Sequence, residues 1–285
     1  MMDSRQEFLR LLDLLAQLIN VVKVSFIDDP NERDRLTYAH NLANRFFQYA
    51  CTILHLCDDK SVENLPSFGN IKVGDPASID VLTRAAMEAF LVFHYIFYSP
   101  STADEKDYRF WTYKAAGLAE RQKLPNDVFE HVEQKAEEKK RLQELCAKLE
   151  SNAFYRSLAP RLKARFVEGK ELDLWRWQSD TNTRLSWRDI GINAGLSELI
   201  ASHMYRHLSG HAHSGSLSVI QTQQAVVRNE VEYLMTPSIN TLKVLAANMI
   251  HEYAELFPEA QPVLTKSGAS TFVDTWVRIG QRLGH

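Results

Sequence analysis

Histidines gather in one short segment of this chain. Four of the ten lie within eleven positions, at His203, His207, His211 and His213. An imidazole can take or give a proton near neutral pH because its pKa lies close to that pH. Arg206 lies in the same segment, and a guanidinium is a permanent two-pronged donor for phosphate oxygens. Together these residue types predict acid–base chemistry on a phosphate ester.

The spacing from Arg206 leaves two histidines as candidates for the acid–base group. His211 follows it by five positions and His213 by seven. On a helix, at about 100° per residue, seven positions return to within roughly 20° of the starting direction, whereas five point about 140° away. A helix that continues therefore favours His213. A helix that ends at Gly210 removes this preference.

The segment resembles the R-x(4-6)-H motif of the HEPN superfamily of small all-α, nucleic-acid-acting domains, and both histidines fit its spacing. The upstream run Arg84-Ala85-Ala86-Met87-Glu88, followed later by Tyr205-Arg206-His207-Leu208-Ser209, is similar to an uncharacterised bacterial helical family associated with that superfamily. The resemblance covers residues 78–220, about half of the chain.

This resemblance implies a function and a set of site residues. It implies a metal-independent endoribonuclease, or a nucleic-acid-targeting effector, of a bacterial defence or toxin system that acts on RNA without a cofactor. Arg206 would hold the phosphate, His211 or His213 would transfer the proton, and the cleft would form between two subunits of a homodimer. Many superfamily members are inactive, so the alternative is a non-catalytic module that binds a partner protein or nucleotide.

A metal-dependent hydrolase is a third interpretation. His203, His207 and His211 are spaced four residues apart, which places them on one helical face, where two imidazoles can share a zinc or other divalent ion. No carboxylate or cysteine lies at a familiar spacing to complete the set, and Glu88 or Glu198 could do so only through the tertiary fold. We therefore expect no metal.

Two charged residues on an apolar stretch are expected to support the site. Arg84 and Glu88 lie one helical turn apart among apolar residues, which predicts a buried ion pair bonded to the Arg206 segment. Because charges in a core need partners, we assign the pair a structural role. The remaining supporting positions are Tyr205, His207 and Ser209.

Basic and aromatic residues alternate between positions 160 and 190. Such side chains can hold a nucleic-acid backbone and stack on bases. Tryptophans near the start of a helix are also common as partly buried anchors. The candidate nucleic-acid-binding residues are Arg176, Trp177, Arg184, Trp187 and Arg188.

Composition predicts a soluble, all-α protein. Among 285 residues, 45% are hydrophobic, the net charge is -3, and only 11 Gly and 9 Pro are present, fewer turn residues than a many-stranded β fold needs. Three cysteines without a C-x-x-C pair indicate reduced thiols and a cytoplasmic location. The most apolar run, residues 85–98, contains Glu88 and His94 and predicts a core helix rather than a membrane span. No P-loop, G-x-G-x-x-G, G-x-S-x-G or H-E-x-x-H motif occurs.

Hydrophobic periodicity divides the chain into three parts. Residues 1–74 are predicted to form a helical hairpin, with helices near 5–26 and 34–57, and a linker. Residues 75–258 are predicted to form a HEPN-like helical bundle with a single core, ending in a helix from Ser238 to Leu256. Residues 259–285 show weak periodicity and are expected to form a C-terminal tail.

Overall fold

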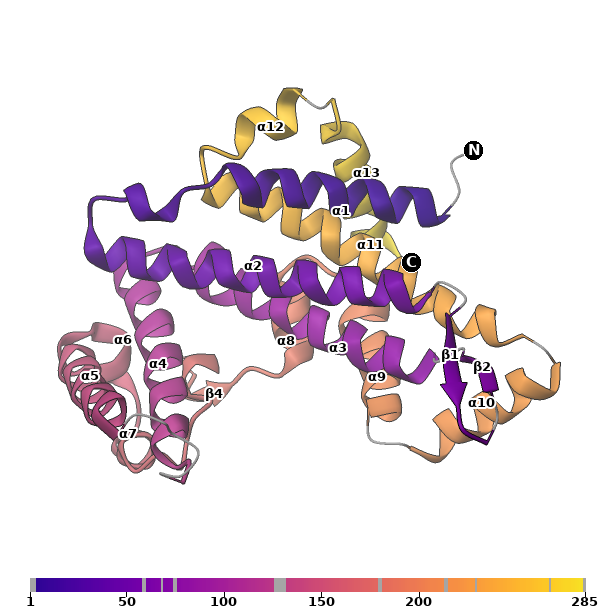
Figure 1. The fold of residues 1–285 in the computed structure, drawn as a ribbon. Helices are drawn as coiled ribbons and strands as arrows, with labels where there is room; N and C mark the ends of the chain where they lie inside the picture. Colours follow the sequence, from indigo (N-terminus) through magenta and orange to yellow (C-terminus); the bar gives the residue numbers. More distant parts are fainter. Residues whose placement is uncertain are drawn as a thin grey trace. The chain divides into compact units, whose positions relative to one another are not determined.

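The computed structural model describes residues 4–57, 60–67, 69–73, 76–125, 132–178, 181–212, 215–228, 230–266 and 268–283. Over these residues the chain is all-α, as the sequence predicts (Figure 1). Its contacts divide it into two compact units, residues 1–94 with 187–285, and residues 95–186. The sequence predicted one core; the segment 95–186 instead builds a hydrophobic cluster of its own.

The first unit contains most of the helices. They are α1 (Ser4–Val21), α2 (Pro30–Leu56), α3 (Pro76–Phe93), α8 (Trp187–Asn193), α9 (Tyr205–Ala212), α10 (Ser216–Arg228), α11 (Val231–Leu256), α12 (Gln261–Lys266) and α13 (Ser270–Arg282), with the short turns η1 (Val24–Phe26) and η5 (Leu199–Met204). Where a linker was expected, β1 (Lys60–Leu65) pairs antiparallel with β2 (Gly69–Val73), in a register that joins Lys60 to Val73.

An antiparallel helical hairpin forms the N-terminal part of this unit, as expected (Figure 1). Asp29 ends the connection by accepting a hydrogen bond from the Asn31 amide at 2.9 Å, and Pro30 occupies the first helical position, where its missing N–H costs nothing. The buried stripe of α1 runs from Phe8 to Leu18 and packs on α2 and α11.

Helix α3 lies among several other helices of the first unit. It packs against α2, α8, α9 and α11, which explains why it is apolar on nearly every face. The helical stretch Pro76–Tyr98 contains an 18-residue window that is apolar enough to cross a membrane, but 67% of that window is buried inside the protein. Asp80 and Thr83 are buried on α3, so its few polar side chains need partners on neighbouring helices.

The C-terminal residues form packed helices. Instead of a tail, residues beyond 258 include α12 and α13, and α13 packs on α11. Gly280 lies buried in the apolar stripe of α13. Because glycine has no apolar side chain, it interrupts the hydrophobic periodicity of residues 259–285, which is one reason why that periodicity is weak in the sequence. Helix α11 also begins at Val231 rather than at Ser238, with Pro237 inside it. Because Pro237 has no N–H, the carbonyl of Tyr233, one turn earlier, loses its helical hydrogen bond. Tyr233 is 75% exposed, so water can bind that carbonyl instead.

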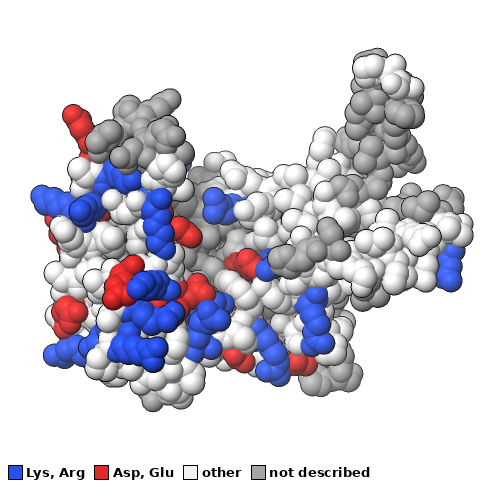
Figure 2. Space-filling model, turned by 90° about the horizontal axis from the view of Figure 1, so that it is seen from below, with Lys and Arg blue, Asp and Glu red and all other residues white. Residues whose placement is uncertain are grey.

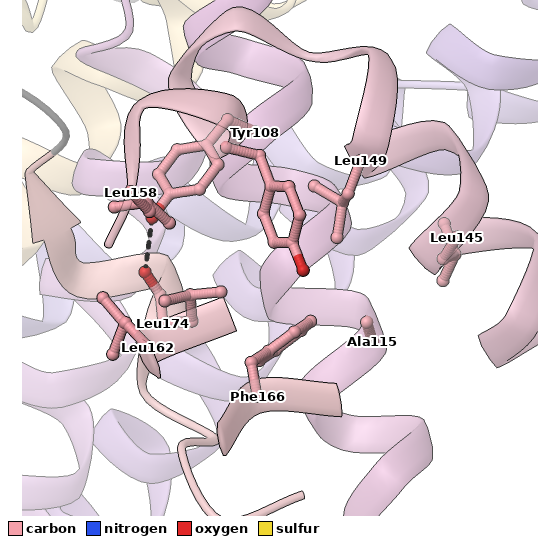
Figure 3. Packing of buried hydrophobic residues seen from close by; sticks show 9 residues of the cluster. Tyr108, Ala115, Leu145, Leu149, Leu158, Leu162, Phe166 and Leu174 are labelled. Atoms are coloured by element: carbon pink, nitrogen blue, oxygen red, sulfur yellow. Dashed lines mark hydrogen bonds between the residues drawn. The ribbon is translucent and has the colours of Figure 1, made fainter. Parts of the chain in front are cut away.

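The second unit is a smaller helical core. It contains α4 (Ala103–Gln122), α5 (Val132–Ser151), α6 (Ala153–Ser157), α7 (Pro160–Val167), the turn η4 (Leu174–Arg176) and the strands β3 (Trp177–Gln178) and β4 (Thr183–Arg184), and η2 (His94–Tyr98) leads into it. Tyr108 is 1% exposed within a cluster that includes Leu149 and Phe166, and its hydroxyl donates to the Leu174 carbonyl at 2.8 Å (Figure 3). A satisfied hydroxyl lets this large ring be fully buried.

Candidate functional site

The Arg206 segment is helical through Gly210. The π-helical turn η5 is followed directly by α9, which ends at Ala212. A helix can pass through Gly210 at a modest cost, because glycine loses more backbone entropy than alanine there. His213 lies outside the described residues, so the comparison of His211 with His213 as partners of Arg206 stays a prediction.

His211 points into the protein, toward a buried carboxylate on α3. Its Nδ1 lies 3.2 Å from Asp80 Oδ2, and the two side chains are 3% and 1% exposed. His207 Nε2 lies 3.7 Å from the same oxygen, and the two imidazole rings are 4.6 Å apart. The other Asp80 oxygen accepts a hydrogen bond from Ser238 on α11. Three elements, α3, α9 and α11, therefore hold this cluster in place.

The contact between His211 and Asp80 is close but is not a well-formed hydrogen bond. The distance of 3.2 Å allows an ion pair, yet His211 Nδ1 has no hydrogen-bond partner among the described residues. The other ring nitrogen, Nε2, lies 3.3 Å from Gln221 Oε1 on α10. An unpartnered buried nitrogen is costly and calls for an explanation.

Burial shifts the pKa of two members of this cluster, Asp80 and His207. It raises the pKa of the Asp80 carboxyl above its usual value, and the Ser238 hydrogen bond and the neighbouring histidines act in the opposite direction. Burial lowers the pKa of His207 below its usual value, although the Asp80 carboxylate opposes that shift. His207 is therefore a neutral imidazole at neutral pH.

Arg206 and the histidines share one open pocket of about 220 Å³. Its lining includes His203, Arg206, His207, His211, Ser218 and Gln221. Arg206 is exposed, and its Nη2 donates a long hydrogen bond of 3.4 Å to Ser202 Oγ. Within the described part of the chain it makes no ion pair, so its guanidinium can meet an anionic ligand.

Arg84 and Glu88 form the expected ion pair, at 3.1 Å. Tyr205 of α9 donates to Glu88 Oε1 at 2.8 Å and accepts from Arg84 Nη2 at 3.3 Å, which links the pair to the Arg206 segment. Burial, followed by the Glu88 carboxylate, raises the pKa of Tyr205 to about 12, so its hydroxyl keeps its proton. The side chains of Arg84 and Glu88 are 24% and 32% exposed, so the pair is half-buried rather than buried. Ser209 is half-buried on the same helix.

Glu88→Ala is expected to lower the free energy of unfolding by about 1–2 kcal/mol, because it removes one hydrogen bond and one half-buried ion pair. Chemical denaturation of the purified protein measures this loss. Glu137→Ala is the matched control, because Glu137 forms an exposed i, i+4 pair with Arg141 on α5. It should change stability by less than about 0.5 kcal/mol. Equal effects of the two substitutions would contradict the supporting role of Glu88.

The five candidate nucleic-acid-binding residues fall in both units. Arg176 and Arg184 in the second unit share the Asp173 carboxylate, and Arg176 is buried. Trp177 packs against the core cluster of that unit.

In the first unit, Arg188 holds Glu198 through two hydrogen bonds of 2.8 and 2.7 Å, and Trp187 lies 6.4 Å from the Tyr205 ring. Each arginine of the set thus has a carboxylate partner within its own unit. Figure 2 likewise shows positive and negative side chains interspersed on the face that it draws.

Sequence reasoning missed Asp80, Ser238 and Gln221, which contact the histidines or the carboxylate beside them. Asp80 lies four residues before Arg84, so Asp80, Arg84 and Glu88 recur at four-residue spacing on α3, which packs on α9. That spacing was a signal available in the sequence. Ser238 and Gln221 carried no comparable signal, because only the fold brings α10 and α11 to this site. The carboxylate at the histidines is Asp80 and not Glu88 or Glu198, which pair with arginines instead.

The chain belongs to a protein family described as a family of unknown function (DUF5677), whose model matches residues 36–224. The matched range includes Asp80 and the whole of α9. No curated protein and no solved structure matches the chain. Membership in this family assigns no activity, so the function has to be inferred from the site.

Proposed function

We propose that the pocket at α9 cleaves RNA without a metal, as a HEPN-type endoribonuclease. One observation carries the proposal: a guanidinium without an ion pair among the described residues and three imidazoles line the same open pocket. The R-x(4-6)-H resemblance supports it, since the same residues form that motif. From this resemblance we also propose a cytoplasmic homodimer acting as an effector in a bacterial defence or toxin system, with a partner protein as its regulator.

The proposed reaction is transfer of the phosphodiester to the ribose 2′-oxygen. His211 Nε2 takes the proton of the 2′-hydroxyl, the 2′-oxygen forms a bond to phosphorus, and the bond to the 5′-oxygen breaks. The leaving 5′-oxygen takes a proton from the solvent that fills the open pocket. The products are a 2′,3′-cyclic phosphate and a free 5′-hydroxyl.

Two neighbours assist His211 in this proposal. The Asp80 oxygen beside His211 Nδ1 favours the tautomer with its proton on Nδ1, which leaves Nε2 as the base. In this tautomer the Gln221 side-chain amide must turn its NH2 group, rather than its oxygen, toward Nε2. Arg206 donates to the phosphate oxygens, where negative charge increases in the transition state. Both roles use only side chains of the described site.

Purified protein is expected to cut single-stranded RNA in excess EDTA and to leave 2′,3′-cyclic phosphate ends, because imidazole rather than a metal-bound water is the base. An RNA of the same sequence with 2′-O-methyl groups is the matched control and should stay intact, because it lacks the attacking hydroxyl. Cleavage that stops with EDTA and returns with zinc or manganese would replace the proposal with a metal-dependent hydrolase. If no RNA is cut, a non-catalytic interaction module becomes the better interpretation.

A further inference from the structure

We infer that Asp80, His207 and His211 bind one divalent ion of the zinc class in the pocket at α9. This inference goes beyond the proposed RNA cleavage, because it concerns binding and holds whether or not RNA is a substrate. It also departs from the sequence-based expectation of no metal, since that expectation depended on the lack of a carboxylate ligand. The tertiary fold supplies that carboxylate on α3.

Two of the three separations between the candidate ligand atoms are close to what a tetrahedral ion requires. Asp80 Oδ2 lies 3.2 Å from His211 Nδ1 and 3.7 Å from His207 Nε2, and the three atoms lie within 4.8 Å of one another. Two ligands at about 2.1 Å from a tetrahedral ion are separated by about 3.4 Å. The two measured distances bracket that separation, so small side-chain rotations are enough to seat an ion.

The unpartnered nitrogen of His211 points to a missing ligand. His211 is nine-tenths buried or more, and its Nδ1 has no hydrogen-bond partner in the described residues. A bound cation would accept the lone pair of this nitrogen and satisfy it. The hydrogen bond from Ser238 to the other Asp80 oxygen fixes the carboxylate in the way that metal-binding carboxylates are usually fixed.

The position of Asp80 selects two of the three evenly spaced histidines. His207 and His211 lie one turn apart on α9 and therefore share a face. His203 has the same four-residue spacing, but it lies in the π-helical turn η5, is exposed, and is not among the three residues whose ligand atoms cluster. The ligand set thus has three members and leaves a fourth position open toward the pocket.

The chemistry of the donors selects the kind of ion. Two imidazole nitrogens and one carboxylate oxygen suit zinc and neighbouring transition metals. Magnesium and calcium prefer six or more oxygen ligands, which this cluster does not offer. Zinc is therefore the probe that should bind, and magnesium is the ion that should not.

The binding experiment uses full-length protein dialysed against EDTA and then freed of chelator. Isothermal titration with zinc chloride is expected to show one ion bound per chain, and magnesium chloride should give no binding heat. Cobalt(II) is expected to give the intense visible absorption of a four-coordinate ion. Asp80→Asn and His207→Ala should each weaken zinc binding by at least about tenfold, because each removes one of three ligands.

His203→Ala is the matched control, since it removes a histidine of the same pocket that lies outside the ligand set. It should bind zinc as the wild-type chain does. Asp80→Asn keeps the shape of the side chain and an oxygen for Ser238, and His207 is only half-buried, so both variants should fold. Absence of zinc binding by the wild-type chain overturns the inference, as does unchanged binding by His207→Ala.

Zinc binding and the proposed RNA cleavage can be separated. An ion on His211 Nδ1 leaves the proton on Nε2, so that nitrogen can no longer act as a base. Zinc is then expected to inhibit the cleavage measured in EDTA, and His207→Ala should weaken this inhibition. If no RNA is cut under any condition, the titration still decides the metal site, so the two proposals do not fail together.

Discussion

Arg206→Ala is expected to reduce the rate of RNA cleavage by about 10²–10³-fold, because it removes a positive donor from the negative transition state. Arg206 is exposed, so the variant should keep the wild-type melting temperature. Arg206→Lys should also be poor, since an ammonium keeps the charge but loses the planar fork that holds two oxygens. Initial rates on a fluorescent single-stranded RNA measure both losses.

The histidine variants decide which imidazole works with Arg206. His211→Ala should be inactive if His211 is the base, and His213→Ala should then be close to normal. The reverse outcome would assign the role to His213, seven positions from Arg206. His203→Ala is the control, because it lies outside the motif spacing and should keep most of its activity. If both His211→Ala and His213→Ala are fully active, the segment is not a ribonuclease site.

Gly280→Ala is expected to lower the free energy of unfolding by about 2–3 kcal/mol through overpacking. A Cβ at this position of α13 would lie 2.3 Å from Cγ1 of Val244 on α11, closer than two carbon atoms can approach. Val244 is fully buried and its branched side chain is stiff, so it cannot swing away. The clash therefore outweighs the gain of about 1 kcal/mol that alanine brings to a helix. Urea denaturation measures the difference.

Two further variants isolate the clash. Gly117→Ala, in α4, introduces a Cβ that meets no atom within 4 Å apart from its chain neighbours and its own helix backbone, so it should be neutral or stabilising by up to about 1 kcal/mol. Val244→Ala removes the clashing methyl groups. The double variant Gly280→Ala with Val244→Ala should therefore be more stable than the sum of the two single losses predicts. Strict additivity of the two losses would contradict the close packing of α11 on α13.

The sequence determined the local elements and part of the site. Apolar spacing predicted the hairpin of α1 and α2, and the four-residue spacing of Arg84 and Glu88 predicted their ion pair. These features depend on residues three or four positions apart, and helix geometry alone places such residues on the same face. The same rule could have added Asp80, one turn before Arg84 on an apolar helix.

Only the tertiary structure decided which groups meet at the site. Ser238 and Asp80 are 158 residues apart, and no periodicity relates α3 to α11. The packing of α3 on α9 brings one carboxylate to His207 and His211 and leaves His203 outside this cluster, although the three histidines are evenly spaced in the sequence. Packing likewise gave Arg184 and Arg188 acidic partners that lie 11 and 10 positions away in the sequence. Such choices depend on which distant surfaces bury each other best, and that is a property of the whole fold rather than of local spacing.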